Sequence, residues 1–180
     1  MATVEPIRKK EDIKKLEKIL SKNKRNYLIF KIGINCGMRI SDILSLDISD
    51  VKNKDAIIIT EKKTQKKRII PLNNKIKNDL KNFIQNKDDN RPLFVNNTTQ
   101  ERLSRISAYR IIKHACYEAN IKGSFGTHTL RKTFGYHFYK KYNDIALLQK
   151  IFNHSHPAIT LRYICIDDET IYNSYLNFIL

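Results

Sequence analysis

The stretch Thr127-His128-Thr129-Leu130-Arg131 places a histidine and an arginine three residues apart, at what looks like the start of a helix. Thr127 is a candidate N-cap, because its side chain can accept a hydrogen bond from the first free backbone N–H groups. Residues three apart on a helix share one face, so we expect His128 and Arg131 to point toward the same surface. Alone, such a pair more often forms a surface hydrogen bond than a reactive site, so its meaning depends on the rest of the chain.

A second stretch, Phe152-Asn153-His154-Ser155-His156-Pro157, ends one predicted helix and leads into a short helix that carries Tyr163. Pro157 cannot continue the preceding helix. Each residue also has a plain structural explanation. His154 would be a hydrogen-bonded turn residue, and Tyr163 would be one of nine tyrosines, most of which pack their rings and keep the hydroxyl in water.

A third stretch places Arg39 just beyond Gly37, which is a natural stop for a helix over 23–36. Arg39 would begin a short helix over 40–46 and could leave the core to face a ligand. Further along, the basic segment 61–67 separates two predicted strands, 56–60 and 68–72, and would form the tip of a hairpin. Lys63 lies in this tip.

Apolar residues at helical and strand spacing predict the remaining elements. The expected fold class is mainly α with a small antiparallel β-sheet (α+β), formed by one domain over residues 1–180. The predicted helices cover 11–22, 23–36, 40–46, 74–86, 104–120, 127–142, 144–152 and 157–163, followed by an amphipathic segment over 168–178.

The chain carries a formal net charge of +16 at pH 7, which favours a polyanionic partner. A lysine-rich surface that only maintains solubility is the alternative. Three scattered cysteines fit reduced, buried thiols in a cytosol, and a zinc site built from His154, His156 and distant cysteines is disfavoured. No apolar run approaches the length of a membrane span. We therefore expect a cytoplasmic, nucleoid-associated protein that does not enter a membrane.

Together these stretches resemble the tyrosine recombinases, the phage integrase family. The segment 37–46 resembles the family's first motif, 128–134 its H-x-x-R motif, 153–155 its histidine motif and 160–163 its nucleophile segment. Lys63 matches the family's lysine by its spacing from Arg39. The four motifs occur in the family's order, and the resemblance runs from the first helix to the C-terminus.

The resemblance implies a role for each residue. Arg39 and Arg131 would fork N–H donors onto the non-bridging oxygens of a phosphodiester, and His154 would add a donor. His128 would accept or donate a proton beside the phosphate. Tyr163 would attack the phosphorus and form a 3′-phosphotyrosyl bond.

Supporting roles follow from the same resemblance. Lys63 would protonate the leaving 5′-oxygen, with Lys62 as the alternative. Asp42 would support the basic cluster, or would be an exposed helix charge. No metal and no cofactor are implied. The backbone of the DNA would be contacted by the remaining hairpin cations, namely Lys62, Lys66, Lys67 and Arg68.

Two departures and three alternatives accompany this interpretation. Asn153 stands where relatives usually carry glycine, and Cys165 where they often do. No N-terminal DNA-clamping domain is apparent.

The expected partner is double-stranded DNA. The protein would be a monomer alone and would form a homotetramer in a synaptic complex, with the C-terminal segment docked on a neighbour or on its own chain. The alternatives are a type IB topoisomerase, a non-catalytic DNA-binding protein of the same fold and, more weakly, an RNA-binding module, which no aromatic-rich stretch supports.

Overall fold

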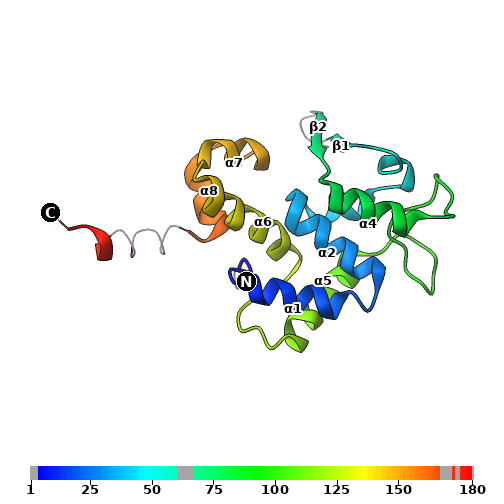
Figure 1. Cartoon of the computed structure of the whole chain (residues 1–180), viewed down its shortest axis with the longest axis horizontal. Helices are drawn as coiled ribbons and strands as arrows, with labels where there is room; N and C mark the ends of the chain where they lie inside the picture. The colour runs from blue at the N-terminus through cyan, green and yellow to red at the C-terminus, as the bar shows by residue number, and fades with distance from the viewer. Residues whose placement is uncertain (1–3, 61–66, 167–171, 173–174, 180) are drawn as a thin grey trace.

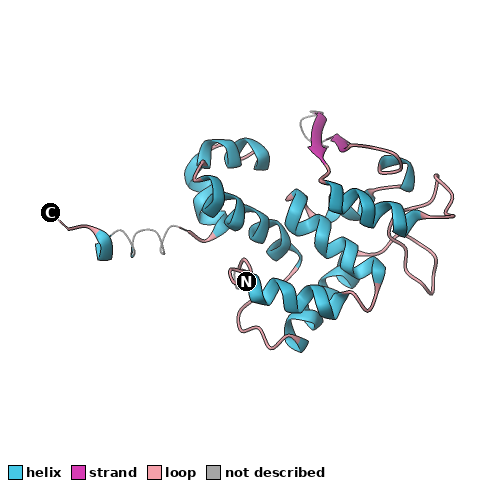
Figure 2. Cartoon of the chain, in the orientation of Figure 1, coloured by secondary structure: helices cyan, strands magenta, loops and turns pink. Residues whose placement is uncertain are grey.

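The structure is a computed structural model that describes residues 4–60, 67–166, 172 and 175–179. Helices dominate it, and one antiparallel pair of strands forms the only sheet within these residues (Figures 1 and 2). The predicted fold class is therefore confirmed. The elements are α1 (Lys10–Leu20), α2 (Lys24–Cys36), α3 (Ile40–Ser45), a 3₁₀ turn (Ile48–Asp50), β1 (Ala56–Thr60), β2 (Lys67–Pro71), α4 (Asn74–Ile84), α5 (Arg105–Glu118), α6 (Thr127–Tyr142), α7 (Ile145–Phe152) and α8 (Pro157–Ile164).

Helix α2 lies at the centre and packs against α1, α4, α5 and α6. The Asn23 side chain accepts a hydrogen bond from the Asn26 N–H and so begins the helix, as N-cap residues do. Gly37 ends it in the left-handed conformation, with φ of 59°, as its sequence position predicts. A Cβ at Gly33 would lie 2.7 Å from the Leu130 side chain, so glycine allows α2 and α6 to approach closely.

The buried side chains form three clusters. One lies between α2, α3, α4 and the strands, and a second lies between α1, α2 and α5. The third joins α6, α7 and α8 through Tyr136, Leu148, Phe152, Ile164 and Ile166. Helices α6 to α8 thus form one side of the molecule in Figure 1, and the hairpin lies on the other, with α3 packed in the same cluster as the strands. The predicted site residues come from both sides.

The two strands pair in antiparallel register, with Ile58 opposite Ile69 and Ile57 opposite Ile70. Ile57 and Ile70 are buried against the core, whereas Ile58 and Ile69 face solvent. The second strand begins and ends one residue earlier than predicted. Residues 61–66 of the predicted hairpin tip lie outside the described residues, and with them Lys62, Lys63 and Lys66.

Helix α6 has the predicted bounds, but its N-cap differs from the prediction. The N-cap is Gly126, not Thr127, which is already the first helical residue. The Gly126 N–H donates to the Thr129 hydroxyl over 3.1 Å. The threonine that hydrogen-bonds at this helix start is therefore Thr129, three residues after the N-cap, and not Thr127. A 3₁₀ turn over 48–50 was not predicted. Within the described residues, no helix has both the length and the apolar character to cross a membrane.

Gly135 allows α7 and α8 to pack on α6, because a Cβ there would lie 2.6 Å from Ile164 and 2.8 Å from Phe152. Overpacking a core typically costs about 1–3 kcal/mol, against a gain of at most about 1 kcal/mol from replacing glycine by alanine in a helix. We expect Gly135→Ala to lower the free energy of unfolding measured in urea. The exposed control Lys141→Ala should leave it nearly unchanged, and an equally stable Gly135→Ala protein would contradict this packing account.

Candidate active site

The side chains of Tyr163 and His128 meet between α8 and α6. The Tyr163 hydroxyl lies 3.4 Å from Nδ1 of His128. Helix α8 delivers the tyrosine after a start at Pro157, where the His156 side chain accepts a hydrogen bond from the Ala158 N–H over 3.2 Å. The tyrosine ring is half-buried, and it stacks edge-on against Phe152, with ring centres 5.5 Å apart. Packing therefore fixes the ring while the hydroxyl faces the histidine.

Arg131 connects the two sides of the molecule. It is only 2% exposed, and it donates one hydrogen bond to the Gly37 carbonyl and another, of 2.9 Å, to the Phe152 carbonyl. Its guanidinium carbon also lies 4.2 Å from the centre of the Phe152 ring. Burial lowers the pKa of Arg131 to about 10, so the group is still cationic at neutral pH. Two carbonyls thus anchor the guanidinium, and a hydrogen bond from Arg131 also lowers the pKa of Tyr163.

Arg39 stands in extended conformation immediately before α3, with φ of −69° and ψ of 147°. It is half-buried, and its charge lowers the pKa values of His128, His154 and Tyr163. Its guanidinium is therefore close enough to all three side chains to act on them. The two arginines supply concentrated positive charge beside the tyrosine hydroxyl.

Asp42 is half-buried on α3 rather than fully exposed. It accepts a hydrogen bond of 3.2 Å from the Ser41 hydroxyl, and its negative charge raises the pKa of Arg131 against the effect of burial. A carboxylate in this place favours the cationic form of the arginine. The supporting role of Asp42 stays a prediction, with this electrostatic effect in its favour.

His154 is fixed by α7 and α8. Its Nδ1 lies 2.9 Å from the hydroxyl of Thr160, which is fully buried, and its carbonyl accepts a hydrogen bond of 3.0 Å from Gln149. The imidazole packs edge-on against Tyr163, with ring centres 5.3 Å apart. Because Nδ1 faces Thr160, Nε2 is the ring nitrogen left for a ligand.

The titration behaviour of the pair suits proton transfer from tyrosine to histidine. Burial, followed by the charges of Arg131, Lys132, Arg39 and Arg105, lowers the pKa of His128, so its imidazole is neutral at pH 7 and can accept a proton at Nδ1. Burial raises the pKa of Tyr163, while Arg131 and Arg39 lower it. The tyrosine hydroxyl is therefore protonated in the free protein, with a neutral acceptor beside it.

The two departures from the family pattern share one backbone explanation. Asn153 closes α7 at φ of 53°, and Cys165 closes α8 at φ of 58°. Both are left-handed conformations, which glycine adopts without steric cost and asparagine tolerates better than most residues. The helices end in the required conformation without glycine, so neither departure removes a group from the site.

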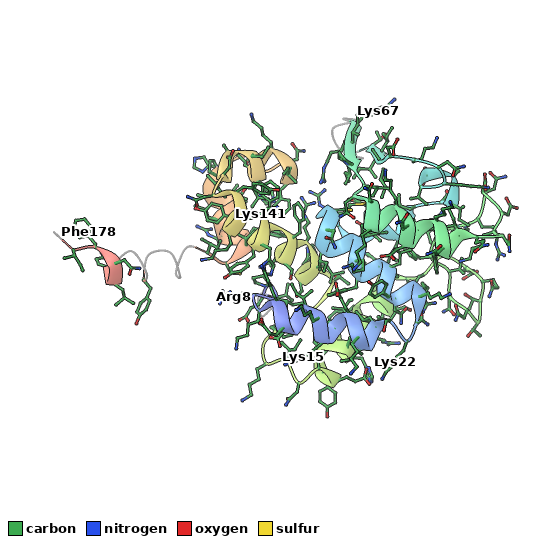
Figure 3. The ribbon with its side chains drawn as sticks, viewed as in Figure 1. Arg8, Lys15, Lys22, Lys67, Lys141 and Phe178 are labelled. Carbon is green, nitrogen blue, oxygen red and sulfur yellow. The ribbon has the colours of Figure 1, made fainter. Side chains whose placement is uncertain are left out.

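Five of the six predicted catalytic residues come together, namely Arg39, His128, Arg131, His154 and Tyr163. The sixth, Lys63, lies outside the described residues. Lys67 is exposed at the outer end of the hairpin (Figure 3). Arg68 is half-buried, and its charge lowers the pKa of Arg131. The described residues contain no group of three or more His, Cys, Asp or Glu side chains that could hold a metal ion.

Several residues that shape the site were not predicted to do so. The carbonyls of Gly37 and Phe152 anchor Arg131, the Thr160 hydroxyl orients His154, and Lys132 lies beneath the tyrosine. Backbone carbonyls leave no signal in a sequence. Thr160 and Lys132 do lie inside quoted motifs, but their residue types do not distinguish a partner from a neighbour.

This fold and this grouping of a tyrosine, two histidines and two arginines define a class of DNA-processing proteins, and comparison with known proteins identifies it. The model of the phage integrase family matches residues 8–170, and the chain belongs to that family. The recognition made from the motifs is thereby confirmed.

Particular relatives support the assignment. The chain is 47% identical to "Probable integrase/recombinase YoeC" of Bacillus subtilis over 176 residues, which is 97% of each chain. The structure resembles that of XerA recombinase, with a TM-score of 0.79 and 25% identity, covering 96% of this chain and 65% of that one. It also resembles the catalytic domain of bacteriophage HP1 integrase, with a TM-score of 0.65 and 25% identity, covering 96% and 95%.

Coverage of the other relatives is lower. The chain spans about half the length of further curated relatives named tyrosine recombinase, for example 55% of one from Pseudothermotoga lettingae and 50% of one from Thermodesulfovibrio yellowstonii. Its similarity to these proteins concerns the part that it covers.

Proposed function

We propose that this chain is a site-specific DNA recombinase that cuts and rejoins strands through a covalent bond between Tyr163 and a DNA 3′-phosphate. The observation that carries the proposal is the 3.4 Å approach of the Tyr163 hydroxyl to Nδ1 of His128, within reach of the charges of Arg39 and Arg131. A phenol beside a neutral base and two cations is suited to attack on a phosphodiester.

In the first step, the Tyr163 oxygen attacks phosphorus, and its proton passes to His128. The bond between phosphorus and the 5′-oxygen breaks, and the leaving oxygen takes a proton from Lys63. A phenol with a pKa near 10 is ionised only about one part in a thousand at pH 7, a deficit of roughly 4 kcal/mol. Proton removal by His128 in the transition state reduces this deficit.

The arginines supply the largest part of the catalysis in this proposal. The phosphorane gains a second negative charge, and preorganised donors aimed at such developing charge are usually the dominant catalytic term. Arg131 is suited to this, because its two carbonyl contacts already fix its orientation. His154 adds an N–H donor from Nε2.

Rejoining is the reverse reaction. A 5′-hydroxyl attacks the phosphorus of the phosphotyrosyl bond and gives its proton to the neutral Lys63, while Tyr163 leaves and takes the proton back from His128. The covalent intermediate conserves the energy of the broken phosphodiester, so the reaction needs no ATP.

Double-stranded DNA is the proposed partner, and the charge of the chain supports this, at +16. Exposed Lys67 and the hairpin residues Lys62 and Lys66 would contact the phosphate backbone. Half-buried Arg68 would add charge from the inner side of the hairpin. The chain would act on chromosomal or mobile-element DNA in the cytoplasm, at the nucleoid.

We further propose that residues 1–180 form one catalytic domain that is monomeric alone and assembles as a tetramer on DNA. The described C-terminal residues support a docking role. Tyr172, Tyr175, Leu176, Phe178 and Ile179 are all exposed, and the segment that carries Phe178 stands apart from the helical body (Figure 3). Such an apolar segment would gain by covering its surface with a neighbouring protomer.

The proposal is tested by covalent capture. The protein is incubated with a pool of nicked duplexes of random central sequence, in which cleavage releases a short fragment and prevents rejoining. Adducts are then precipitated in detergent and their DNA is sequenced. We expect adducts enriched in one target sequence, joined at the 3′-phosphate. A protein that binds the pool but yields no adduct would be a non-catalytic DNA-binding protein, and adducts without sequence preference, together with relaxation of plasmids, would indicate a type IB topoisomerase.

Metal removal is expected to leave cleavage intact, because arginines provide the charge stabilisation that a metal would otherwise supply. The rate of adduct formation should be equal in EDTA and in magnesium, measured on the captured target. Cleavage that depends on the metal would contradict the proposed mechanism and would point to a nuclease.

The role of Lys63 is tested by changing the leaving group. A substrate with sulfur in place of the bridging 5′-oxygen needs little proton assistance, because a thiolate is a stable leaving group. We expect this substrate to restore cleavage by Lys63→Ala but not by Arg131→Ala, whose defect lies in charge stabilisation.

The neighbouring lysines are the matched controls. Lys62→Ala should need no rescue, while Lys66→Ala and Lys67→Ala should lower DNA affinity and flatten its salt dependence. Rescue of Lys62→Ala instead of Lys63→Ala would move the acid by one residue. Rescue of neither would return the role of general acid to a histidine.

A further inference from the structure

Lys132 presents a buried ammonium group directly behind the tyrosine. It is 4% exposed, and its Nζ lies 3.6 Å from the Cys165 sulfur and 5.2 Å from the centre of the Tyr163 ring. Both of these contacts, at the end of α8 and on the tyrosine ring, lie in the segment that carries the proposed nucleophile. Lysine is rarely this deeply buried, so the contacts that hold it there point to a role at this place.

One part of the explanation is the end of α8. Cys165 is the C-cap of that helix, and the C-terminal end of a helix carries partial negative charge that favours a nearby cation. Arg8 holds the same turn independently, by donating to the Cys165 carbonyl over 3.1 Å. The turn therefore has a second cationic anchor, and holding it does not depend on Lys132 alone.

The second part of the explanation is the effect of Lys132 on His128. Lys132 lies four residues further along α6, on the same side as His128, and its charge is among those that lower the pKa of that histidine. The groups that face or act on the imidazole are the Tyr163 hydroxyl from α8, Arg131 and Lys132 from α6, Arg39 from the turn before α3, and Arg105 from the start of α5. All of these except the hydroxyl are cations.

We propose that Lys132 is a positioning residue for the reaction: its buried ammonium supports the end of α8 behind Tyr163 and places a positive charge one helical turn from His128, the acceptor of the tyrosine proton. The role of Lys132 in cleavage rests on the proposed function. Its effect on the pKa of His128 does not, because that effect exists in the free protein. Lys132 itself touches no reacting atom. Its ammonium lies over the ring of Tyr163, so in this proposal it acts on the site through its charge and does not bind the phosphate.

The test is a titration of His128 in the free, full chain, followed by NMR with ¹³C-labelled histidine. The His128→Gln variant assigns the signal among the five histidines. We expect the pKa of His128 to be higher in Lys132→Met than in the parent, and close to the parent value in Lys132→Arg. An unchanged or lower pKa in Lys132→Met would overturn the proposal.

Two controls separate charge from packing. Lys141→Met removes a charge from the exposed far end of the same helix, and it should leave the pKa of His128 unchanged. Cys165→Ala removes the sulfur contact but keeps the ammonium, and it should also leave the pKa unchanged. A shift in Cys165→Ala as large as that in Lys132→Met would assign the effect to packing and overturn the electrostatic role. If Lys132→Met does not fold, the neutral Lys132→Gln carries the same test.

Activity gives an independent readout. Since the neutral imidazole is the proton acceptor, the acidic limb of the pH–rate profile for adduct formation should move to higher pH in Lys132→Met and return in Lys132→Arg. A limb that stays at the parent position in Lys132→Met would contradict the inference. A parent protein that forms no adduct would refute the proposed function, while the NMR titration would still decide whether Lys132 acts on His128.

Discussion

Tyr163→Phe is expected to abolish covalent attachment to DNA and to leave DNA affinity nearly unchanged. The substitution removes only the hydroxyl that lies 3.4 Å from His128. The ring keeps its edge-on contacts with Phe152 and His154, so the site should hold its shape. Adduct formation is measured on the captured target by denaturing gel, and affinity by fluorescence anisotropy on the same DNA.

Tyr172→Phe and Tyr175→Phe are the matched controls for this result. Both tyrosines are exposed on the C-terminal segment, nine and twelve residues after Tyr163, and both variants should form adducts as the parent does. A persistent adduct in Tyr163→Phe that disappears in one of these variants would assign the nucleophile to the C-terminal segment and reject Tyr163.

Arg131→Lys and Arg39→Lys are expected to lose about 10²–10³ in the rate of cleavage, the usual effect of removing a donor from a site that stabilises developing charge. Lysine keeps the charge but offers a compact ammonium instead of a planar fork. At Arg131 the loss should be the larger of the two. Its guanidinium holds the Gly37 and Phe152 carbonyls while facing the site, and an ammonium cannot do both.

Single-turnover rates on the suicide substrate measure this effect, with thermal unfolding to confirm that each variant is folded. Arg91→Lys is a suitable control, since Arg91 is exposed and its side chain donates to Gln100 over 3.2 Å. Cleavage by either site variant within a few-fold of the parent would remove that arginine from the phosphate clamp.

Much of the fold could be predicted because local signals and tertiary packing agree. Helix α6 has the predicted bounds, and Gly37 closes α2 as its position indicates. The turn that follows leaves Arg39 extended before α3, which is why its side chain can leave the core. Elements with a strong apolar pattern and a clear stop were therefore predicted to within a few residues.

The details that were missed depend on contacts between distant segments. The N-cap of α6 is Gly126, whose N–H donates to the Thr129 hydroxyl. The sequence favours Thr127 instead, because threonine is a common N-cap residue. The anchoring of Arg131 uses two backbone carbonyls, one of them 94 residues away along the chain. Similarly, only the fold reveals that Lys132 lies behind Tyr163.

Asn153 and Cys165 show that another residue can adopt the backbone conformation for which relatives use glycine. Relatives usually place glycine before the histidine, and here Asn153 adopts the same left-handed conformation, as does Cys165 after α8. The backbone geometry, not the residue type, is what delivers His154 and Tyr163. A sequence pattern alone cannot show that the substitute reaches that geometry.

The central claim is that Tyr163 carries the DNA, and mass spectrometry of the trapped adduct tests it most directly. The complex is digested with nuclease and protease, and the C-terminal peptide, which contains Tyr163, Tyr172 and Tyr175, is fragmented to locate the residual nucleotide. The account predicts a 3′-phosphonucleotide on Tyr163 alone. A nucleotide on Tyr172 or Tyr175, or on a residue outside this peptide, would contradict it.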